Sequence, residues 1–266
     1  MKKIKRLLII IALTISFGYL ILFIFQRKFL YFPTKVNQNI VERIKQKYKN
    51  AEKFLNVEKN IKIHSWFIDK KSENTIIYFG GNAEDVNYTL LNFLDKTNYN
   101  IATMSYRSYG LSEGSVSEKS IYKDVLFFYD YLLDAEKIKN PIIIGRSLGT
   151  GIATYLASKR NIKKVILISP YDSIENIAKE QFPFAPITLL LKDKFLAENY
   201  AKTINKPMLA IYSKADRVVT QKHSKALIKS WKGKVKVIEE ENHNHGSLLF
   251  GNDNLLKQID DFIVSK

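Results

Sequence analysis

The chain has 266 residues, of which 46% are hydrophobic, enough for one large domain or two small ones. It contains no cysteine, which excludes disulfides, thiolate zinc sites and cysteine nucleophiles. The formal net charge is +16, but the lysines are spread along the chain and no nucleic-acid-binding motif accompanies them. We therefore expect no nucleic-acid partner, and the charge suits the acidic headgroups of a membrane surface.

The N-terminus carries an apolar run, LLIIIALTISFGYLILFIF at 7–25, without a charged residue. As a helix, this run would span about 28 Å, close to the thickness of a bilayer's hydrocarbon core. The run ends in large residues, Phe23, Ile24 and Phe25, which do not suit a signal-peptidase site. The sequence therefore predicts an uncleaved single-pass membrane anchor, with its basic flanks, over residues 1–28.

The orientation of this anchor is predicted from the charges beside it. Four basic residues precede the apolar run, and Arg27 and Lys28 follow it, which favours an N-terminus in the cytoplasm. Further basic residues at 35, 43 and 45 nearly balance this bias. We expect the catalytic domain on the periplasmic side of a bacterial inner membrane.

The remainder of the chain divides into a linker and one domain. Residues 29–60 are expected to form the linker, with an amphipathic helix over 40–55. From residue 61 to 266, short runs rich in Ile, Val and Leu alternate with helical patterns, which predicts an α/β domain with helices on both faces of a mostly parallel sheet. The predicted strands are 61–67, 75–79, 100–105, 141–144, 164–169, 207–213 and 234–239, and the clearest helices are 117–134 and 254–264.

A candidate nucleophile lies directly after one of these strands. The strand 141–144 runs into Gly145-Arg146-Ser147-Leu148-Gly149, and a helical segment follows. A G-x-S-x-G turn between strand and helix lifts the serine oxygen above the sheet, and its glycines permit close backbone approach. The pattern also occurs by chance, and a glycine-rich turn with a capping serine is the alternative. In this setting we predict Ser147 as the nucleophile.

The partners of such a serine follow it in the order acid, then histidine. Asp216 follows the strand 207–213 and is the expected acid, and Asp172, which more simply caps a helix, is the reserve candidate. His64 precedes the serine, and His223 begins a lysine-rich helix and is expected at the surface.

The general base is expected in the loop ENHNHGS at 241–247. This loop lies between the last strand and the terminal helix and holds two histidines, His243 and His245. The residues alone leave both open.

An oxyanion hole requires two backbone N–H groups. One is expected from Leu148, the residue after the nucleophile. The other is expected from Asn82, in the glycine-containing loop 80–83 that follows the strand 75–79. A plain glycine turn into a helix is the alternative reading of that loop.

At this point the chain resembles a known family: the membrane-anchored branch of the α/β-hydrolase superfamily, related to eukaryotic protein depalmitoylases and their bacterial relatives. The similar segments are LYFPTK at 30–35, GGNAED at 80–85, YRSYGLSEG at 106–114, GRSLGTG at 145–151, SPYDSIENIA at 169–178 and NHNH at 242–245. The resemblance implies an α/β-hydrolase fold, and in that fold the long connection 171–200 would form a lid over the site, although an ordinary pair of helices would also fit.

The resemblance also assigns roles to residues. It implies Ser147 as nucleophile, Asp216 as acid and His243 as base, because the family's catalytic histidine is typically followed by asparagine, as His243 is by Asn244. His245 remains the alternative base. The chain departs from the family in having Gly80 where a histidine is usual and Ser108 where a glycine is usual. Tyr106 and Arg107 are expected to support the site without taking part in catalysis.

These observations together predict a membrane-anchored serine hydrolase that cleaves carboxylic esters or thioesters through an acyl-enzyme. Activated water completes such a reaction, so no cofactor or metal is implied. The apolar side chains Phe182, Phe184, Leu189 and Leu190 suit a lipid or acylated substrate. A serine aminopeptidase-like peptidase and a catalytically silent anchored binding module are the alternatives.

Overall fold

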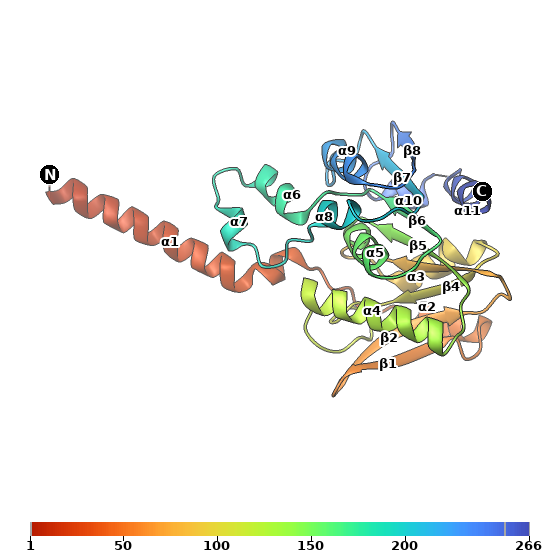
Figure 1. Ribbon diagram of the computed structural model, residues 1–266. Helices are drawn as coiled ribbons and strands as arrows, with labels where there is room; N and C mark the ends of the chain where they lie inside the picture. The colour runs from red at the N-terminus through yellow and green to blue at the C-terminus, as the bar shows by residue number, and fades with distance from the viewer. Residues whose placement is uncertain (1, 253, 266) are drawn as a thin grey trace.

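The computed structural model describes residues 2–252 and 254–265, and only the backbone of residues 12 and 15. The expected outer limits of the anchor and of the α/β domain, residues 1 and 266, lie outside the described residues. The long helix α1 projects from a three-layer α/β body, as Figure 1 shows.

The body is built on an eight-stranded sheet in the order β1-β2-β4-β3-β5-β6-β7-β8. Strands β1 and β2 and the pair β2 and β4 run antiparallel, and every other neighbouring pair is parallel. The strands are β1 (Glu52–Glu58), β2 (Ile61–Ile68), β3 (Asn74–Phe79), β4 (Asn100–Met104), β5 (Asn140–Arg146), β6 (Lys164–Ile168), β7 (Met208–Ser213) and β8 (Val235–Glu240). The predicted α/β class and mostly parallel sheet are confirmed.

Helices cover both faces of the sheet, and each face has its own apolar core. Alternate residues of the central strands point to opposite faces, as in β5, where Ile143 packs with α4 and α5 while Ile142 and Ile144 pack with α2, α3 and α11. The helices are α1 (Lys2–Leu30), α2 (Gln38–Lys47), α3 (Val86–Asn92), the short 3-10 turn η1 (Leu94–Lys96), α4 (Glu118–Asp134), α5 (Leu148–Lys159), α6 (Ile174–Gln181), α7 (Ile187–Leu190), α8 (Ala197–Ala201), α9 (Gln221–Ser230), α10 (Ser247–Phe250) and α11 (Leu255–Val264).

Helix α1 is the one helix of the described residues that is long and apolar enough to cross a membrane. The most apolar window of α1 has a mean hydropathy of 2.8 and is not buried in the protein, so this helix does not form part of the core. The connection between β6 and β7 carries α6 and α7, which lie beside the C-terminal half of α1 (Figure 1).

The linker predicted over 29–60 is wrong in its second half. The amphipathic helix begins at Gln38 and ends at Lys47, and Glu52–Glu58 then forms the edge strand β1, paired with β2. In β1 only alternate residues are buried, because one face of this edge strand meets solvent, and so it lacks the continuous apolar run that marks the central strands. The buried Val41 and Ile44 make α2 part of the body as well.

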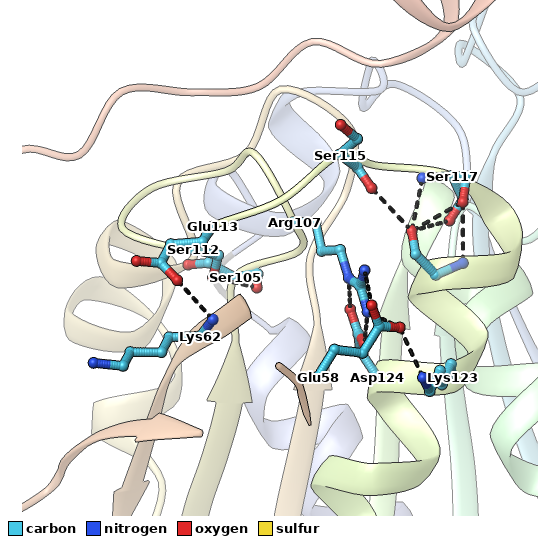
Figure 2. A network of polar contacts seen from close by, with 11 residues as sticks. Glu58, Lys62, Ser105, Arg107, Ser112, Glu113, Ser115, Ser117, Lys123 and Asp124 are labelled. Carbon is cyan, nitrogen blue, oxygen red and sulfur yellow. Dashed lines mark hydrogen bonds and ion pairs between the residues drawn. The ribbon is translucent and has the colours of Figure 1, made fainter. Parts of the chain in front are cut away.

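The segment YRSYG braces the body beneath the site, as expected. Figure 2 shows Arg107, which donates from Nε and Nη2 to the carboxylate of Asp124 at 2.8 and 2.7 Å and also contacts Glu58. Ser108 has a φ of 68°, a left-handed conformation that glycine adopts more readily, which accounts for the family's usual residue there. The hydroxyl of Tyr106 donates to the carbonyl of Gly80 at 2.8 Å and thereby supports the oxyanion loop.

Candidate active site

Ser147 lies in a sharp turn between β5 and α5. Its φ of 49° and ψ of −119° are strained for a residue with a side chain, and such strain is characteristic of functional sites. The two glycines beside it are required by the packing. A Cβ on Gly145 would lie 2.4 Å from the carbonyl oxygen of Gly149, and a Cβ on Gly149 would lie 2.1 Å from that of Phe79. The turn that was predicted from G-x-S-x-G is therefore present.

A continuous chain of hydrogen bonds joins Ser147, His245 and Asp216. His245 Nε2 lies 2.9 Å from Ser147 Oγ, and His245 Nδ1 lies 2.7 Å from Asp216 Oδ2. This is the geometry in which an imidazole takes a proton from a serine hydroxyl while a carboxylate fixes its tautomer. The three side chains follow the carboxyl ends of β5, β7 and β8, which lie on the same side of the parallel part of the sheet.

Asp216 is only 3% exposed and is held ionised by its neighbours. Burial by itself would raise the pKa of Asp216, but hydrogen bonds from His245 and from the N–H groups of Val218 and Val219 lower that pKa below its ordinary value. The hydroxyl of Ser169 also donates to the carboxylate, at 2.9 Å. The carboxylate is therefore available as a hydrogen-bond acceptor for the imidazole.

The preference for His243 over His245 is wrong. Among the described residues, no hydrogen bond joins His243 to Ser147 or Asp216, and both contacts belong to His245. Asn244 folds the loop into a turn by accepting from the N–H groups of Gly246 and Ser247, and Arg146 Nη2 donates to the carbonyl of His245 at 3.1 Å. Asn244 thus precedes the histidine at the site and does not follow it, so the His-Asn pattern selected the wrong residue.

The reserve acid Asp172 forms a separate pair with His223. His223 Nδ1 lies 2.8 Å from Asp172 Oδ1, and both residues are buried, so the expectation of a surface His223 is wrong. Burial opposes ionisation of Asp172, but the hydrogen bonds from His223 and Asn176 lower its pKa. This pair links the beginning of α6 to α9 and does not contact Ser147 within the described part of the chain. His64, which is also buried, contacts Glu52 at 3.0 Å.

The two residues that are expected to supply oxyanion N–H groups both lie at the cavity of the nucleophile. Leu148 begins α5, and Asn82 lies in the loop after β3, and both residues line the cavity that contains Ser147. No hydrogen bond within residues 2–252 and 254–265 occupies the N–H of either residue. Two unoccupied N–H groups at a serine are suited to hold a developing oxyanion.

A buried ion pair fixes the two loops that carry these groups. Glu84 Oε2 accepts from Arg146 Nη1 at 2.8 Å and from the N–H of Gly81 at 2.7 Å. Burial alone would lower the pKa of Arg146, but the charge of Glu84 raises it above its ordinary value. Since Arg146 also holds the carbonyl of His245, one guanidinium joins the oxyanion loop, the nucleophile turn and the histidine loop. Glu84 was not predicted as a site residue, although it lies in the segment GGNAED.

Ser147 opens into a cavity of about 480 Å³. This volume is in the range of small-molecule sites. The lining is predominantly apolar and comes from α1, the connection 174–191 and residues 218–219. The site can therefore present a nucleophile, a base and an oxyanion hole to a substrate with an apolar part.

Comparison with known proteins agrees with this reading of the fold. Residues 74–203 match the family model of the alpha/beta hydrolase fold. The chain is 32% identical over 163 residues to a protein of Acanthamoeba polyphaga mimivirus that is named as an alpha/beta hydrolase, L404, and the match covers 58% of this chain and 60% of that one. It is 31% identical over 180 residues to the lysophosphatidylserine lipase ABHD12 of Rattus norvegicus, a match that covers 58% of this chain and 45% of the lipase.

Among solved structures, the esterase Pf2001 of Pyrococcus furiosus superposes with a TM-score of 0.67 at 21% identity, and the superposition covers 88% of this chain and 97% of the esterase. This protein has the α/β-hydrolase fold, and the matches to alpha/beta hydrolases support that superfamily and a hydrolase activity. The matched segment spans about three fifths or less of the curated relatives named above.

Proposed function

We propose that this protein is a membrane-anchored serine hydrolase that cleaves carboxylic esters or thioesters. The observation that carries the proposal is the chain of contacts from Ser147 Oγ through His245 to Asp216, at 2.9 and 2.7 Å. The relatives named as an esterase and as a lipase support ester chemistry. The exposed apolar face of α1 supports the anchor, and we infer the periplasmic orientation from the flanking charges alone.

The reaction proceeds in two halves. Ser147 Oγ attacks the substrate carbonyl carbon as His245 Nε2 accepts the hydroxyl proton, and the N–H groups of Leu148 and Asn82 hold the oxyanion. The tetrahedral intermediate collapses, the bond to the leaving oxygen or sulfur breaks, and His245 returns its proton to the departing alcohol or thiol. Water then attacks the acyl-enzyme with His245 as base, which releases the carboxylic acid and restores Ser147.

The two neighbouring histidines supply a test with a matched control. We expect the full chain in detergent to react with a fluorophosphonate probe and to hydrolyse p-nitrophenyl esters. His245→Ala should lower kcat by about 10³-fold or more, since it removes the base, whereas His243→Ala should retain activity within about threefold. Ser147→Ala should abolish labelling.

Other outcomes lead to different conclusions. Equal labelling of the wild type and Ser147→Ala, or labelling of neither, would contradict the enzyme assignment. A preference for aminoacyl anilides over esters would indicate a peptidase. An equal loss in both histidine variants would contradict the assignment of His245 as the base.

A further inference from the structure

The cavity above Ser147 has two walls, and one of them is the apolar helix α1. Tyr19, Leu22, Phe23, Gln26 and Phe29 all line it. These positions recur every three or four residues, so they form a single face of the helix. The other wall consists of α6, α7 and the turn between them. The helix is therefore part of the binding site as well as a candidate membrane span.

Specific polar contacts hold α1 against this second wall. Arg27 Nε donates to Asp193 Oδ2 at 2.7 Å, and Gln26 Nε2 donates to the carbonyl of Leu190 at 3.0 Å. The N–H of Lys192 donates back to Gln26 Oε1 at 2.7 Å. The side chain of Asp193 is only 4% exposed and that of Arg27 is 46% exposed, so a partly buried ion pair joins the two walls.

The end of α1 is also joined to the oxyanion loop. Asn82 Nδ2 donates to the carbonyl of Leu30 at 2.6 Å, and Asn82 Oδ1 accepts from the N–H of Phe32 at 3.0 Å. Asn82 is also the residue whose N–H we propose as an oxyanion donor. The position of the helix and the position of the oxyanion donor are thereby coupled through one side chain.

The cavity extends alongside the apolar run of α1. Tyr19 lies six residues before Phe25, the end of the apolar run, which corresponds to about 9 Å along a helix. The hydroxyl of Tyr19 donates to the carbonyl of Phe184 at 3.5 Å, so the turn between α6 and α7 lies at the same level. In that turn and in α7, Phe184 is 96% exposed and Leu189 is 81% exposed. Aromatic and aliphatic side chains so exposed beside an apolar helix suit lipid better than water.

Much of the backbone of this turn finds its partners within the protein, although no hydrogen bond among the described residues uses the N–H groups of Phe184 and Thr188. A membrane interior requires that backbone polar groups find partners within the protein. Pro183 and Pro186 have no N–H group to satisfy. The N–H of Ala185 donates to the carbonyl of Phe182 at 3.1 Å, and the N–H of Leu191 donates to that of Ile187 at 2.8 Å.

From this arrangement we propose that residues 19–32 of the chain and the tip 182–190 lie in the same membrane leaflet and enclose the acyl chain of the substrate. The substrate is then an amphiphile with a long acyl chain that resides in this leaflet. It enters the cavity from the leaflet and presents its ester or thioester carbonyl to Ser147. This inference rests on the proposed function, since it names the substrate class of that site.

Two substitutions on opposite faces of α1 test whether this helix forms a wall of the acyl-chain cavity. Leu22 lines the cavity and is 49% exposed, and Ile24 is 56% exposed and does not line it. With the full chain in lipid nanodiscs, Leu22→Trp should fill the cavity and lower kcat/KM for p-nitrophenyl palmitate by about tenfold or more, and Ile24→Trp should not. Turnover of p-nitrophenyl acetate and labelling of Ser147 should be unchanged in Ile24→Trp, and Leu22→Trp should lower turnover of the palmitate ester more than turnover of the acetate ester.

Each failure has its own signature. If Leu22→Trp and Ile24→Trp behave alike on the palmitate ester, or if the wild type prefers the acetate ester, the inference is overturned while the hydrolase stands. If the wild type turns over neither ester and Ser147 is not labelled, the proposed function itself fails.

A fluorescence measurement tests the depth independently of activity. The native Trp66 and Trp231 are buried in the body, so added tryptophans report on their own sites. In vesicles of phosphatidylcholine brominated on its acyl chains, Phe184→Trp should be quenched relative to unbrominated vesicles. Phe127→Trp, on α4 and also exposed, should not be quenched. Equal quenching of the two, or none at Phe184→Trp, would show that the tip lies outside the leaflet.

Discussion

At the scale of single residues, the chemistry depends on a serine in a strained turn and on a buried carboxylate. The strain at Ser147 is imposed by the packing of Gly145 and Gly149, where any side chain would overlap backbone oxygens. Asp216 requires hydrogen-bond partners, since a buried carboxylate must be paired to remain charged. Its three kinds of hydrogen-bond donor, an imidazole, a hydroxyl and two N–H groups, meet that requirement.

The lowered pKa of Asp216 gives a pH-dependent contribution to stability. A carboxylate whose pKa is depressed in the folded state stabilises the protein above its ordinary pKa of 3.8, and this contribution is lost as the pH falls through the folded value. Asp216→Asn cannot titrate. We therefore expect the difference in unfolding free energy between wild type and Asp216→Asn to be constant above about pH 5 and to change steadily below about pH 4, in favour of the variant. Urea denaturation in detergent, followed by circular dichroism, measures the unfolding free energy of each protein. A difference between the two proteins that is independent of pH would contradict the role of the hydrogen bonds to the Asp216 carboxylate.

At the scale of elements, the central strands and the nucleophile turn could be predicted because their signals are local. The strand 141–144 is apolar on both faces, and the glycines around Ser147 are required by contacts within a few residues or with the adjoining strand. The edge strand β1 could not be found in this way, since its burial alternates and its partner is chosen by register with β2. The choice of His245 over His243 depends on the turn made by Asn244 and on Arg146, which is distant in the chain.

The Arg107 network also depends on contacts between segments that are distant in the chain. It joins β1, α4 and the loop after β4 (Figure 2). The side chains of Arg107 and Asp124 are 6% and 1% exposed, so each buried charge is stabilised by the other. Removal of Asp124 leaves the buried guanidinium of Arg107 with only the partly exposed Glu58 as its partner. Asp124→Ala should therefore lower the unfolding free energy by about 3 kcal/mol, at the lower end of the cost of breaking a buried pair.

An exposed ion pair provides the control for this prediction. Lys139 and Glu73 are 67% and 69% exposed, and Glu73→Ala should change stability by less than about 1 kcal/mol. Urea denaturation of both variants in the same detergent makes the comparison. Similar effects of the two substitutions would indicate that the Arg107 network is solvated and contributes little.

At the scale of the whole molecule, one helix serves both the membrane and the active site. The cavity-lining positions of α1 begin at Tyr19, and none of the described side chains between residues 2 and 18 lines the cavity. If α1 is a membrane anchor as we propose, the apolar residues before Tyr19 meet only lipid, whereas those from Tyr19 onward also meet substrate. This division follows from the length of α1. About 19 residues are needed to span the bilayer, and the protein body contacts only the C-terminal part of that span.

This division predicts how the anchor tolerates exchange. Replacing residues 7–16 by an unrelated apolar sequence of the same length should leave kcat/KM for p-nitrophenyl palmitate within about twofold, because it preserves the hydrophobic length and the basic flank and changes none of the described side chains that line the cavity. Replacing Tyr19, Leu22 and Phe23 together by alanine should remove apolar contacts with the acyl chain and lower that value by about tenfold, with little effect on p-nitrophenyl acetate. Steady-state kinetics of both proteins in nanodiscs measures kcat/KM for the two esters. Equal sensitivity of the two segments would mean that α1 acts only as a tether, and a loss confined to the replacement of residues 7–16 would place the selective segment at the opposite end of the helix.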